Sequence, residues 1–536
     1  MATGALAWAA LALLLAAGGA RAQDEADDAV GQFLSERAAR QALPPSVQPS
    51  VQTSVPPAAQ HAEQQAVPRA SAAFGASAAL PASVEAALRA ARMPAGSVTA
   101  LVVDASGQQP ARLAWQTQAQ VNPASIMKLV TTYAALDSLG PAYTWRTNVY
   151  LSGPVRDGVL QGDLVIEGGG DPQLVVEKLW LLMRRVQGLG IRAIAGDIVL
   201  DHNAFALPPH DAAAFDGEPL RPYNASPDAL LINYKSLVMT FVPQPASAGA
   251  PGYAAVHYEP PLAGLQLPAR VPLAPTQPCG DWRTGLQADI SAAGVSVAGS
   301  YPAACGEQSW AVAYPDPASY AARAVLGIWQ GLGGTLGGQV RDGRVPPGLA
   351  PVLGAASPTL AEVIRDVNKY SNNVMAQHVF LALSLPQPAA SGARPGFAAS
   401  FDLSRLALQR WWQARLPGVP VPEPDNGAGL SRAARLSADG LGHLLQLAYR
   451  SPYAAEYIAS LPIVGVDGTM RRNRSGVTGH LKTGTLRDAS GVAGYVQGDS
   501  GRHYVVIMIA NDPNAPAVRP ATDALLEWAA RDLAVP

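Results

Sequence analysis

The segment Asn122-Pro123-Ala124-Ser125-Ile126-Met127-Lys128 places a hydroxyl and an amine three residues apart. The Asn-Pro pair indicates a helix start, since proline is tolerated in the first helical turn. Residues at i and i+3 share one helix face, so the Ser125 hydroxyl can meet the Lys128 amine beside the unpaired N–H groups of that turn. Ser125 is the candidate nucleophile and Lys128 the candidate base.

A second polar segment, Lys369-Tyr370-Ser371-Asn372-Asn373, lies between two apolar helical stretches. Ser371 offers a hydroxyl for proton relay. Asn373 offers a carboxamide that can donate to and accept from a substrate amide at once.

A third segment, Lys482-Thr483-Gly484-Thr485, falls in a strand-like run. Lys482 supplies fixed positive charge, and Gly484 allows a substrate backbone to approach the strand closely. Thr483 and Thr485 can hold a carboxylate. Each of the three segments, standing alone, is an ordinary solvated helix, turn or strand end.

The elements that must position these segments indicate an α+β fold. Strands from both ends of the chain predict an antiparallel sheet, and the helical stretches between them predict its cover. The predicted strands are 97–104, 112–118, 479–485, 491–497 and 503–509, and the predicted helices are 175–189, 318–331, 360–383, 402–415, 437–448 and 521–533. Residues 146–350 contain many short strands and turns, which predicts mostly β domains inserted between the first and second segments. The run Gly168-Gly169-Gly170-Asp171-Pro172 lacks the lysine and spacing of a P-loop and is interpreted as a turn.

The chain therefore divides into a catalytic domain in two parts, 81–145 and 351–536, around the insertion at 146–350. Residues 1–22 contain an apolar run that ends in small residues at an Ala-x-Ala site, which predicts a signal peptide and export to the periplasm. Because that run is shorter than the roughly 20 residues needed to span a bilayer, no stable transmembrane anchor is expected, although peripheral membrane contact stays open. Residues 23–80, rich in Ala, Gln and Pro, predict a disordered tether.

The composition narrows the partners. With a net charge of −2 and scattered basic residues, the chain shows no nucleic-acid footprint. Cys279 and Cys305, the two cysteines, can close one disulfide in an oxidising compartment, with two free thiols as the alternative. No histidines stand at ligand spacing beside them, so neither a metal nor another cofactor is expected.

The order of the three segments, Ser-x-x-Lys, Ser-x-Asn and Lys-Thr-Gly, resembles the signatures of penicillin-binding proteins and serine β-lactamases. The interval from position 125 to position 371 is 246 residues, far more than a compact β-lactamase needs. With it the chain resembles the class C low-molecular-mass penicillin-binding proteins, which are exported D-alanyl-D-alanine carboxypeptidases and endopeptidases. The resemblance covers about residue 81 to the C-terminus and extends to residues 162–172, 426–432, 461–469 and 493–495.

This resemblance implies a penicillin-binding-protein/serine β-lactamase-like transpeptidase domain that cleaves the D-Ala-D-Ala bond of peptidoglycan stem peptides. Ser125 would form an acyl-enzyme, also with β-lactam antibiotics. Lys128 would be the base, while Ser371 and Lys482 would relay the proton. Asn373 would bind the substrate peptide, and Thr483, Gly484 and Thr485 its carboxylate end. Cleavage of D-Ala-diaminopimelate cross-links and a homodimer stay open.

Three alternatives remain at this level. Tyr370 and Asn372 also satisfy the Tyr-x-Asn form of class C β-lactamases; the large insertion favours Ser371 and Asn373. A serine β-lactamase, or a catalytically silent wall-binding protein, would share these segments. Asp216, in the insertion, is the candidate for selecting a substrate side chain that carries an amine, with an ordinary loop aspartate as the plainer interpretation.

Overall fold

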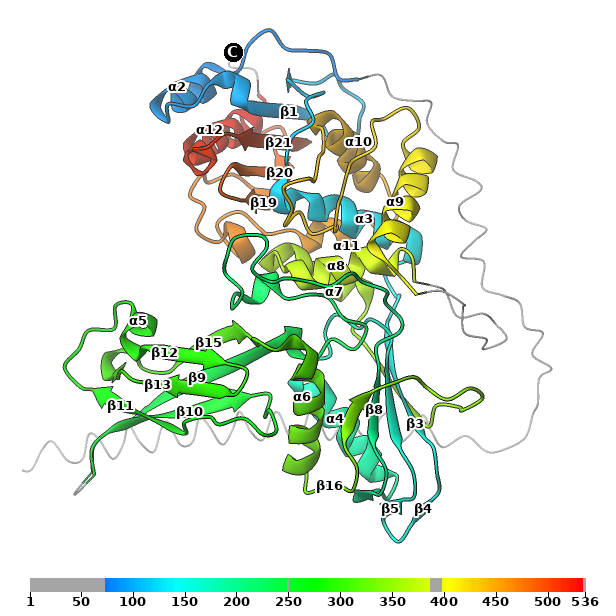
Figure 1. Ribbon diagram of the computed structural model, residues 1–536. Helices are drawn as coiled ribbons and strands as arrows, with labels where there is room; N and C mark the ends of the chain where they lie inside the picture. Colours follow the sequence, from blue (N-terminus) through cyan, green and yellow to red (C-terminus); the bar gives the residue numbers. More distant parts are fainter. Residues whose placement is uncertain (1–72, 248–249, 386–397, 534–536) are drawn as a thin grey trace, which may run out of the picture. The chain divides into compact units, whose positions relative to one another are not determined.

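The computed structural model describes residues 73–247, 250–385 and 398–533 (Figure 1). Its central sheet has the strand order β19-β20-β21-β1-β2, and every neighbouring pair is antiparallel. These strands are β1 (Val98–Asp104), β2 (Leu113–Trp115), β19 (Gly479–Thr485), β20 (Ala489–Gln497) and β21 (His503–Asn511). The predicted antiparallel sheet built from both ends of the chain is confirmed.

Helices cover both faces of this sheet, so β1, β20 and β21 are buried along most of their length. Along β1, Ala100 and Val102 face one cluster of buried side chains, and Leu101 and Val103 face the other. The first cluster contains α2 (Ala82–Ala90) and α12 (Arg519–Ala530). The second contains α3 (Met127–Leu139), α7 (Leu360–Tyr370), α8 (Asn373–Ala382), α9 (Phe401–Arg415), α10 (Ala438–Tyr449) and α11 (Ala454–Ser460).

The predicted helix at 360–383 is two helices, α7 and α8, that break at Ser371. The backbone of Ser371 is left-handed, with φ 58° and ψ 35°, which ends α7. The side chain of Asn372 then accepts from the N–H of Met375 and caps the start of α8. A polar turn between two apolar stretches is thereby held as a sharp corner.

The first part of the insertion combines two sheets, ordered β17-β8-β6-β3-β18 and β16-β7-β5-β4. Parallel pairing of β6 with β8 requires a crossover, which α4 provides. The elements are β3 (Arg146–Leu151), β4 (Val155–Arg156), β5 (Val159–Leu160), β6 (Leu164–Gly168), α4 (Val176–Gly188), β7 (Ala193–Ile194), β8 (Ile198–Asp201), α6 (Pro317–Gly331), β16 (Thr335–Leu336), β17 (Val340–Asp342) and β18 (Leu353–Ala356).

The second part of the insertion is a sheet of order β14-β11-β10-β9-β15 with the hairpin β12-β13. A disulfide joins Cys279 to Cys305 across this part, so the alternative of two free thiols is wrong. The elements are β9 (Ser236–Gln244), β10 (Tyr253–Glu259), β11 (Arg270–Ala274), α5 (Trp282–Leu286), β12 (Ala288–Ser291), β13 (Gly294–Val297), β14 (Tyr301–Pro302) and β15 (Gln308–Ala313).

Two predicted boundaries shift. β18 pairs with β3, so the sheet of the insertion reaches residue 356 rather than 350; the run Leu-Gly-Ala-Ala carries too weak a strand pattern to show this. Residues 73–80, predicted as tether, are packed: the Phe74 ring stacks on His443 and Leu80 is buried. The signal peptide and the tether up to residue 72 lie outside the described residues. Within the described ranges, no helix has the length and hydropathy to cross a bilayer.

Candidate active site

Ser125 lies in a single 3-10 turn, η2 (Ala124–Ile126), immediately before α3. The turn is strained, because Ala124 has a φ of 49°, a region that costs a non-glycine residue about 1–3 kcal/mol. Asn122 holds it: its Oδ1 accepts from the N–H of Ala124 at 2.9 Å, and its Nδ2 donates to the carbonyl of Ser431 at 2.9 Å. The surrounding structure therefore fixes the direction of the Ser125 side chain.

The amine of Lys128 touches Ser125 and is fully buried. Its Nζ lies 2.9 Å from Ser125 Oγ, 2.7 Å from Asn373 Oδ1 and 2.6 Å from the carbonyl oxygen of Ala428. The side chain has 0% exposure, and its three hydrogen-bond partners are all neutral. The first and second predicted segments thus meet at this nitrogen.

Lys482 is the counterpart of Lys128 on the strand side. Its Nζ donates to Ser371 Oγ at 2.9 Å and to the carbonyl of Thr483 at 2.6 Å, and its exposure is also 0%. Each predicted hydroxyl, Ser125 and Ser371, therefore bonds to a different buried lysine. Asn373 completes the group, since its Nδ2 donates to the carbonyl of Tyr223 at 3.3 Å.

Burial shifts the pKa of both lysines downwards. Desolvation, and then the charge of Lys482, hold the pKa of Lys128 well below its usual range. Desolvation lowers the pKa of Lys482 to about 7. Burial therefore favours the neutral form of both amines, and the charge of Lys482 favours it further at Lys128.

The edge strand β19 closes the site beside the serine turn. A Cβ at Gly484 would lie 2.7 Å from the carbonyl oxygen of Pro123, so only glycine lets the strand approach the turn this closely. We expected Gly484 to make room for substrate; in the structure, the serine turn itself fills that space.

Along β19 the N–H groups alternate between the neighbouring strand and the open edge. The N–H of Leu481 donates outward to Pro462, and that of Leu486 donates inward to Ala489. The N–H of Thr485, in phase with Leu481, therefore faces the open edge of the sheet. Thr483 is half-exposed, and its hydroxyl donates to that of Thr469 at 2.8 Å.

The local geometry distinguishes the two possible registers of the second segment, Ser371/Asn373 and Tyr370/Asn372. Tyr370 is 68% exposed, and Asn372 is engaged as the cap of α8. The side chains of Ser371 and Asn373 point instead to Lys482 and Lys128. The geometry favours the register Ser371/Asn373.

Sequence reasoning assigned no role to the loop 426–432. Within it Gly427 and Gly429 have φ of 76° and 74°, and a Cβ at Gly429 would collide with the carbonyl of Ala124. This close approach brings the carbonyl of Ala428 to Lys128. The Gly-x-Gly spacing was the available signal, but by itself it indicates only a turn.

Asp216 does not contact Lys128, Asn373 or Lys482 directly. It is exposed, and its carboxylate accepts from the Tyr223 hydroxyl at 2.9 Å and from Asn224 Nδ2 at 2.8 Å. Desolvation raises the pKa of Asp216, but these hydrogen bonds outweigh it and hold that pKa below its usual value. Since the carbonyl of Tyr223 accepts from Asn373, one residue connects Asp216 to the buried group.

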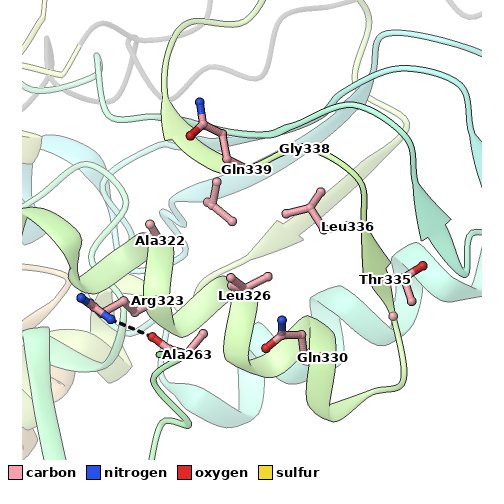
Figure 2. A pocket seen from close by; sticks show the side chains of 11 residues that line it. Ala263, Ala322, Arg323, Leu326, Gln330, Thr335, Leu336, Gly338 and Gln339 are labelled. Carbon is pink, nitrogen blue, oxygen red and sulfur yellow. Dashed lines mark hydrogen bonds between the residues drawn. The ribbon is translucent and has the colours of Figure 1, made fainter. Parts of the chain in front are cut away.

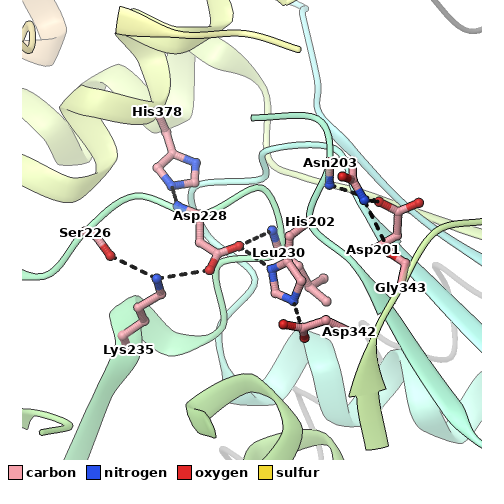
Figure 3. Close-up of polar contacts among 10 residues, drawn as sticks. All are labelled: Asp201, His202, Asn203, Ser226, Asp228, Leu230, Lys235, Asp342, Gly343 and His378. Carbon is pink, nitrogen blue, oxygen red and sulfur yellow. Dashed lines mark hydrogen bonds and ion pairs between the residues drawn. The ribbon is translucent and has the colours of Figure 1, made fainter. Parts of the chain in front are cut away.

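A second polar cluster ties the insertion to α8 (Figure 3). Asp228 lies 2.5 Å from His202 Nδ1 and 3.0 Å from Lys235 Nζ, and its backbone N–H donates to His378 Nε2. His378 Nδ1 bonds to the carbonyl of Gly170, and burial lowers the pKa of His378 to about 4, so the ring is neutral. The Gly-rich turn thus serves as an acceptor beside the helix that carries Asn373.

A cavity of about 710 Å³ lies elsewhere, in the insertion (Figure 2). α6, β16 and β17 supply most of its walls, and its one charged side chain, Arg323, donates to the carbonyl of Ala263 at 2.8 Å. Its lining contains no carboxylate, histidine, cysteine or lysine that could act as a base. In the described ranges, no cluster of three or more His, Cys, Asp or Glu side chains is arranged to hold a metal ion.

Comparison with known proteins identifies the family. Residues 80–532 match the D-Ala-D-Ala carboxypeptidase 3 (S13) family, and the chain belongs to that family. It is 30% identical over 434 residues to a D-alanyl-D-alanine carboxypeptidase of Actinomadura sp. strain R39, an alignment that covers 76% of each chain. It is 23% identical to the D-alanyl-D-alanine carboxypeptidase DacB of Haemophilus influenzae, over 72% of this chain and 80% of that one.

The fold agrees with this assignment. The crystal structure of penicillin-binding protein 4 (dacB) from Haemophilus influenzae superposes with a TM-score of 0.64 at 22% identity, covering 84% of this chain and 99% of that one. The predicted class C penicillin-binding-protein family and fold are confirmed. So is the prediction of a serine-type D-Ala-D-Ala carboxypeptidase, a serine peptidase acting on peptidoglycan.

We predict that Ser371→Ala slows acylation by labelled penicillin by about 10²-fold or more, because general acid–base groups typically contribute 10²–10⁴-fold. Tyr370→Phe, the matched control, should leave the rate unchanged, since that side chain points to solvent. Stopped-flow or quench labelling measures both rates. A loss confined to the tyrosine variant would establish the other register.

Proposed function

We propose that Ser125 is the nucleophile of this carboxypeptidase and that Lys128 removes its proton. Ser125 Oγ would form an ester with the carbonyl carbon of the penultimate D-alanine while the bond to the terminal D-alanine breaks. Water would then hydrolyse the ester. The observation that carries this assignment is the 2.9 Å contact between Ser125 Oγ and a lysine amine whose pKa is lowered by complete burial.

The pair formed by Ser371 and Lys482 would supply the proton that the leaving group needs. Lys128 takes it from Ser125, and Ser371, bonded to the protonated Lys482, would deliver a proton to the departing amine nitrogen. The charge of Lys482 is a second cause that lowers the pKa of Lys128, whereas burial alone lowers that of Lys482, which supports Lys128 as the base and Lys482 as the charged donor. Asn373 would orient the substrate peptide beside them.

The backbone N–H groups of Ser125 and Thr485 would hold the oxyanion. Support comes from the N–H of Thr485 at the open edge of β19, next to the serine turn. Such a donor typically contributes about 2.7–4 kcal/mol to the transition state. Thr483 and Thr485 would receive the terminal carboxylate, and the half-exposed position of Thr483 is compatible with that role.

We predict that labelled penicillin attaches to Ser125 and that Ser125→Ala abolishes the adduct. Peptide mapping of the adduct by mass spectrometry measures this. A slow loss of label would exclude a β-lactamase, which needs fast deacylation, and release of D-alanine from a stem peptide would exclude a silent wall-binding protein. Labelling of Ser125→Ala at the wild-type level would refute the assignment.

A bell-shaped pH profile of acylation is expected. The rate should rise with pH as Lys128 loses its proton, because only the neutral amine accepts one. It should fall as pH rises through about 7, where Lys482 loses its own proton. Rates of penicillin acylation across the pH range measure both limbs; a rate that keeps rising through alkaline pH would contradict the role of Lys482.

Asp216 would select substrates whose side chain carries a free amine. Its hydrogen bonds from Tyr223 and Asn224 keep the carboxylate ionised and oriented, and Tyr223 leads directly to Asn373. An ionised carboxylate at this position attracts a cationic substrate group. The free amine of a diaminopimelate residue in a stem peptide has that chemistry.

We predict that Asp216→Ala lowers kcat/KM about tenfold on a diaminopimelate-bearing peptide, by loss of one charge-assisted hydrogen bond. The same peptide with its side-chain amine acetylated is the control and should be cleaved equally by both proteins. Product analysis by chromatography gives the two ratios. Equal rates on the free-amine peptide would remove Asp216 from recognition.

We further propose export to the periplasm, on the signal-like residues 1–22, where peptidoglycan and β-lactams would be the partners. The disulfide between Cys279 and Cys305 supports an oxidising compartment.

A further inference from the structure

A stretch of chain with several basic residues and no acidic one includes the proposed carboxylate ligands Thr483 and Thr485. From residue 468 to residue 487 the chain has four arginines, one lysine and no acidic residue, although its net charge is −2. Lys482 is the buried lysine described above. The four arginines, Arg471, Arg472, Arg474 and Arg487, are all exposed, and together we name them the arginine rim.

Three members of the arginine rim follow η6 (Gly468–Met470), which is fixed against the site. Thr469 accepts from the Thr483 hydroxyl at 2.8 Å, two residues before Arg471. A Cβ at Gly468 would lie 2.5 Å from the carbonyl of Lys369, so the turn packs directly on the end of α7. The backbone that carries these arginines therefore begins at the edge of β19.

The segment of residues 471–474 is tied to the fold at two places, one before it and one within it. Before it, Asp467 pairs with the almost fully buried Lys369 at 2.6 Å. Within it, between Arg472 and Arg474, Asn473 Nδ2 donates to Asp523 at 2.7 Å. A fixed segment holds its charges in place, so their fields add instead of averaging out.

Arg487 approaches from the other side. It lies in the turn between β19 and β20, which the bond from the N–H of Leu486 to the carbonyl of Ala489 closes. It stands two residues after Thr485, the last residue of β19. Arg471 thus follows Thr469, the partner of Thr483, by two residues, and Arg487 follows Thr485 by two.

No guanidinium of the arginine rim pairs with a carboxylate of the described residues. The nearest acids in sequence are Asp467, which pairs with Lys369, and Asp488, which follows Arg487. Among other exposed arginines, Arg89, Arg341 and Arg531 form ion pairs, whereas Arg156, Arg192 and Arg344 form none with the described residues; close spacing in the chain is what sets the arginine rim apart. Clustered like charges repel one another and raise the local concentration of anions.

We propose that the arginine rim binds carboxylates of peptidoglycan stem peptides neighbouring the one being cleaved, and so holds the enzyme on the polymer. The proposal rests on the proposed function, because it takes Thr483 and Thr485 as the end that receives a carboxylate. Polymeric peptidoglycan presents many peptide carboxylates at close spacing, whereas a soluble short peptide presents one. Arginine matches a carboxylate with two parallel N–H donors.

The size of the effect follows from the clustering. One exposed ion pair contributes little, but clustered charge of one sign can raise the local concentration of an anionic ligand by 10–10³. Salt screens such a field over about 10 Å at 0.1 M ionic strength. Binding to polymer should therefore be strong at low salt and weaken as salt is added.

The test compares binding to insoluble peptidoglycan sacculi. We combine Arg471→Gln, Arg472→Gln and Arg474→Gln in the Ser125→Ala protein, so that the sacculi are not digested. The matched control carries Arg156→Gln, Arg192→Gln and Arg344→Gln, which remove the same charge from exposed positions in the insertion. At low ionic strength the rim variant should bind about tenfold more weakly than the parent, and the control within about twofold of it.

A second comparison identifies the ligand. Sacculi whose carboxylates have been converted to amides should bind the parent protein as weakly as native sacculi bind the rim variant. With Ser125 restored, the rim variant should still take up one equivalent of labelled penicillin and cleave a soluble stem peptide at near the parent rate. Those two assays test the proposed function separately, since its failure would abolish labelling without changing sacculus binding.

Three results would overturn the proposal. Equal weakening in the rim variant and the control would show an effect of net charge alone. Unchanged binding to amidated sacculi, or loss of binding only when phosphate-containing polymers are stripped from the sacculi, would show that carboxylates are not the ligand. A soluble peptide cleaved as poorly as the polymer is bound would show that the substitutions disturb the catalytic site itself.

Discussion

The site depends on two lysine amines that are buried together without a carboxylate between them. Lys128 and Lys482 are both fully buried, and in the described part of the chain their partners are hydroxyls, an amide oxygen and backbone carbonyls. A carboxylate beside either amine would stabilise its charged form and keep its proton on. Neutral acceptors instead orient the amines while burial lowers their pKa values. The lowered pKa of both amines is a consequence of this choice of partners.

Holding such groups together requires backbones to approach closely. β19 approaches the serine turn only because position 484 is glycine, and the loop at 426–432 does so only because position 429 is glycine. The left-handed Ala124 lies between these two contacts and is retained by Asn122. Strain at the residue before Ser125, the proposed nucleophile, is thus balanced by neighbouring Asn122 and by contacts from two distant parts of the sequence.

The insertion also contributes to the site. Tyr223 accepts from Asn373, and the Asp228 cluster connects the strands of the insertion to His378 on the same helix. Because Asn373 opens α8 and His378 lies further along it, the insertion contacts this helix at two places. The long interval between the Ser-x-x-Lys and Ser-x-Asn segments therefore supplies part of the support for the second one.

The sequence by itself determined the chemistry and much of the fold. Ser125 with Lys128, Ser371 with Asn373, and Lys482 are recognisable because short spacings on a helix start, a turn and a strand are local properties. The sheet strands were predictable for the same reason, since an apolar run is visible without its partners. The ends of the tether at residue 80 and of the insertion at residue 350 were missed because packing of Phe74 and pairing of β18 depend on residues far away in the chain. Only the tertiary structure shows that Ser371 and Asn373 face the buried lysines, that Ala428 supplies an acceptor to Lys128, and that burial lowers the pKa of both lysines. Each of these depends on burial and on distances between separate segments, and burial exists only once the chain has folded.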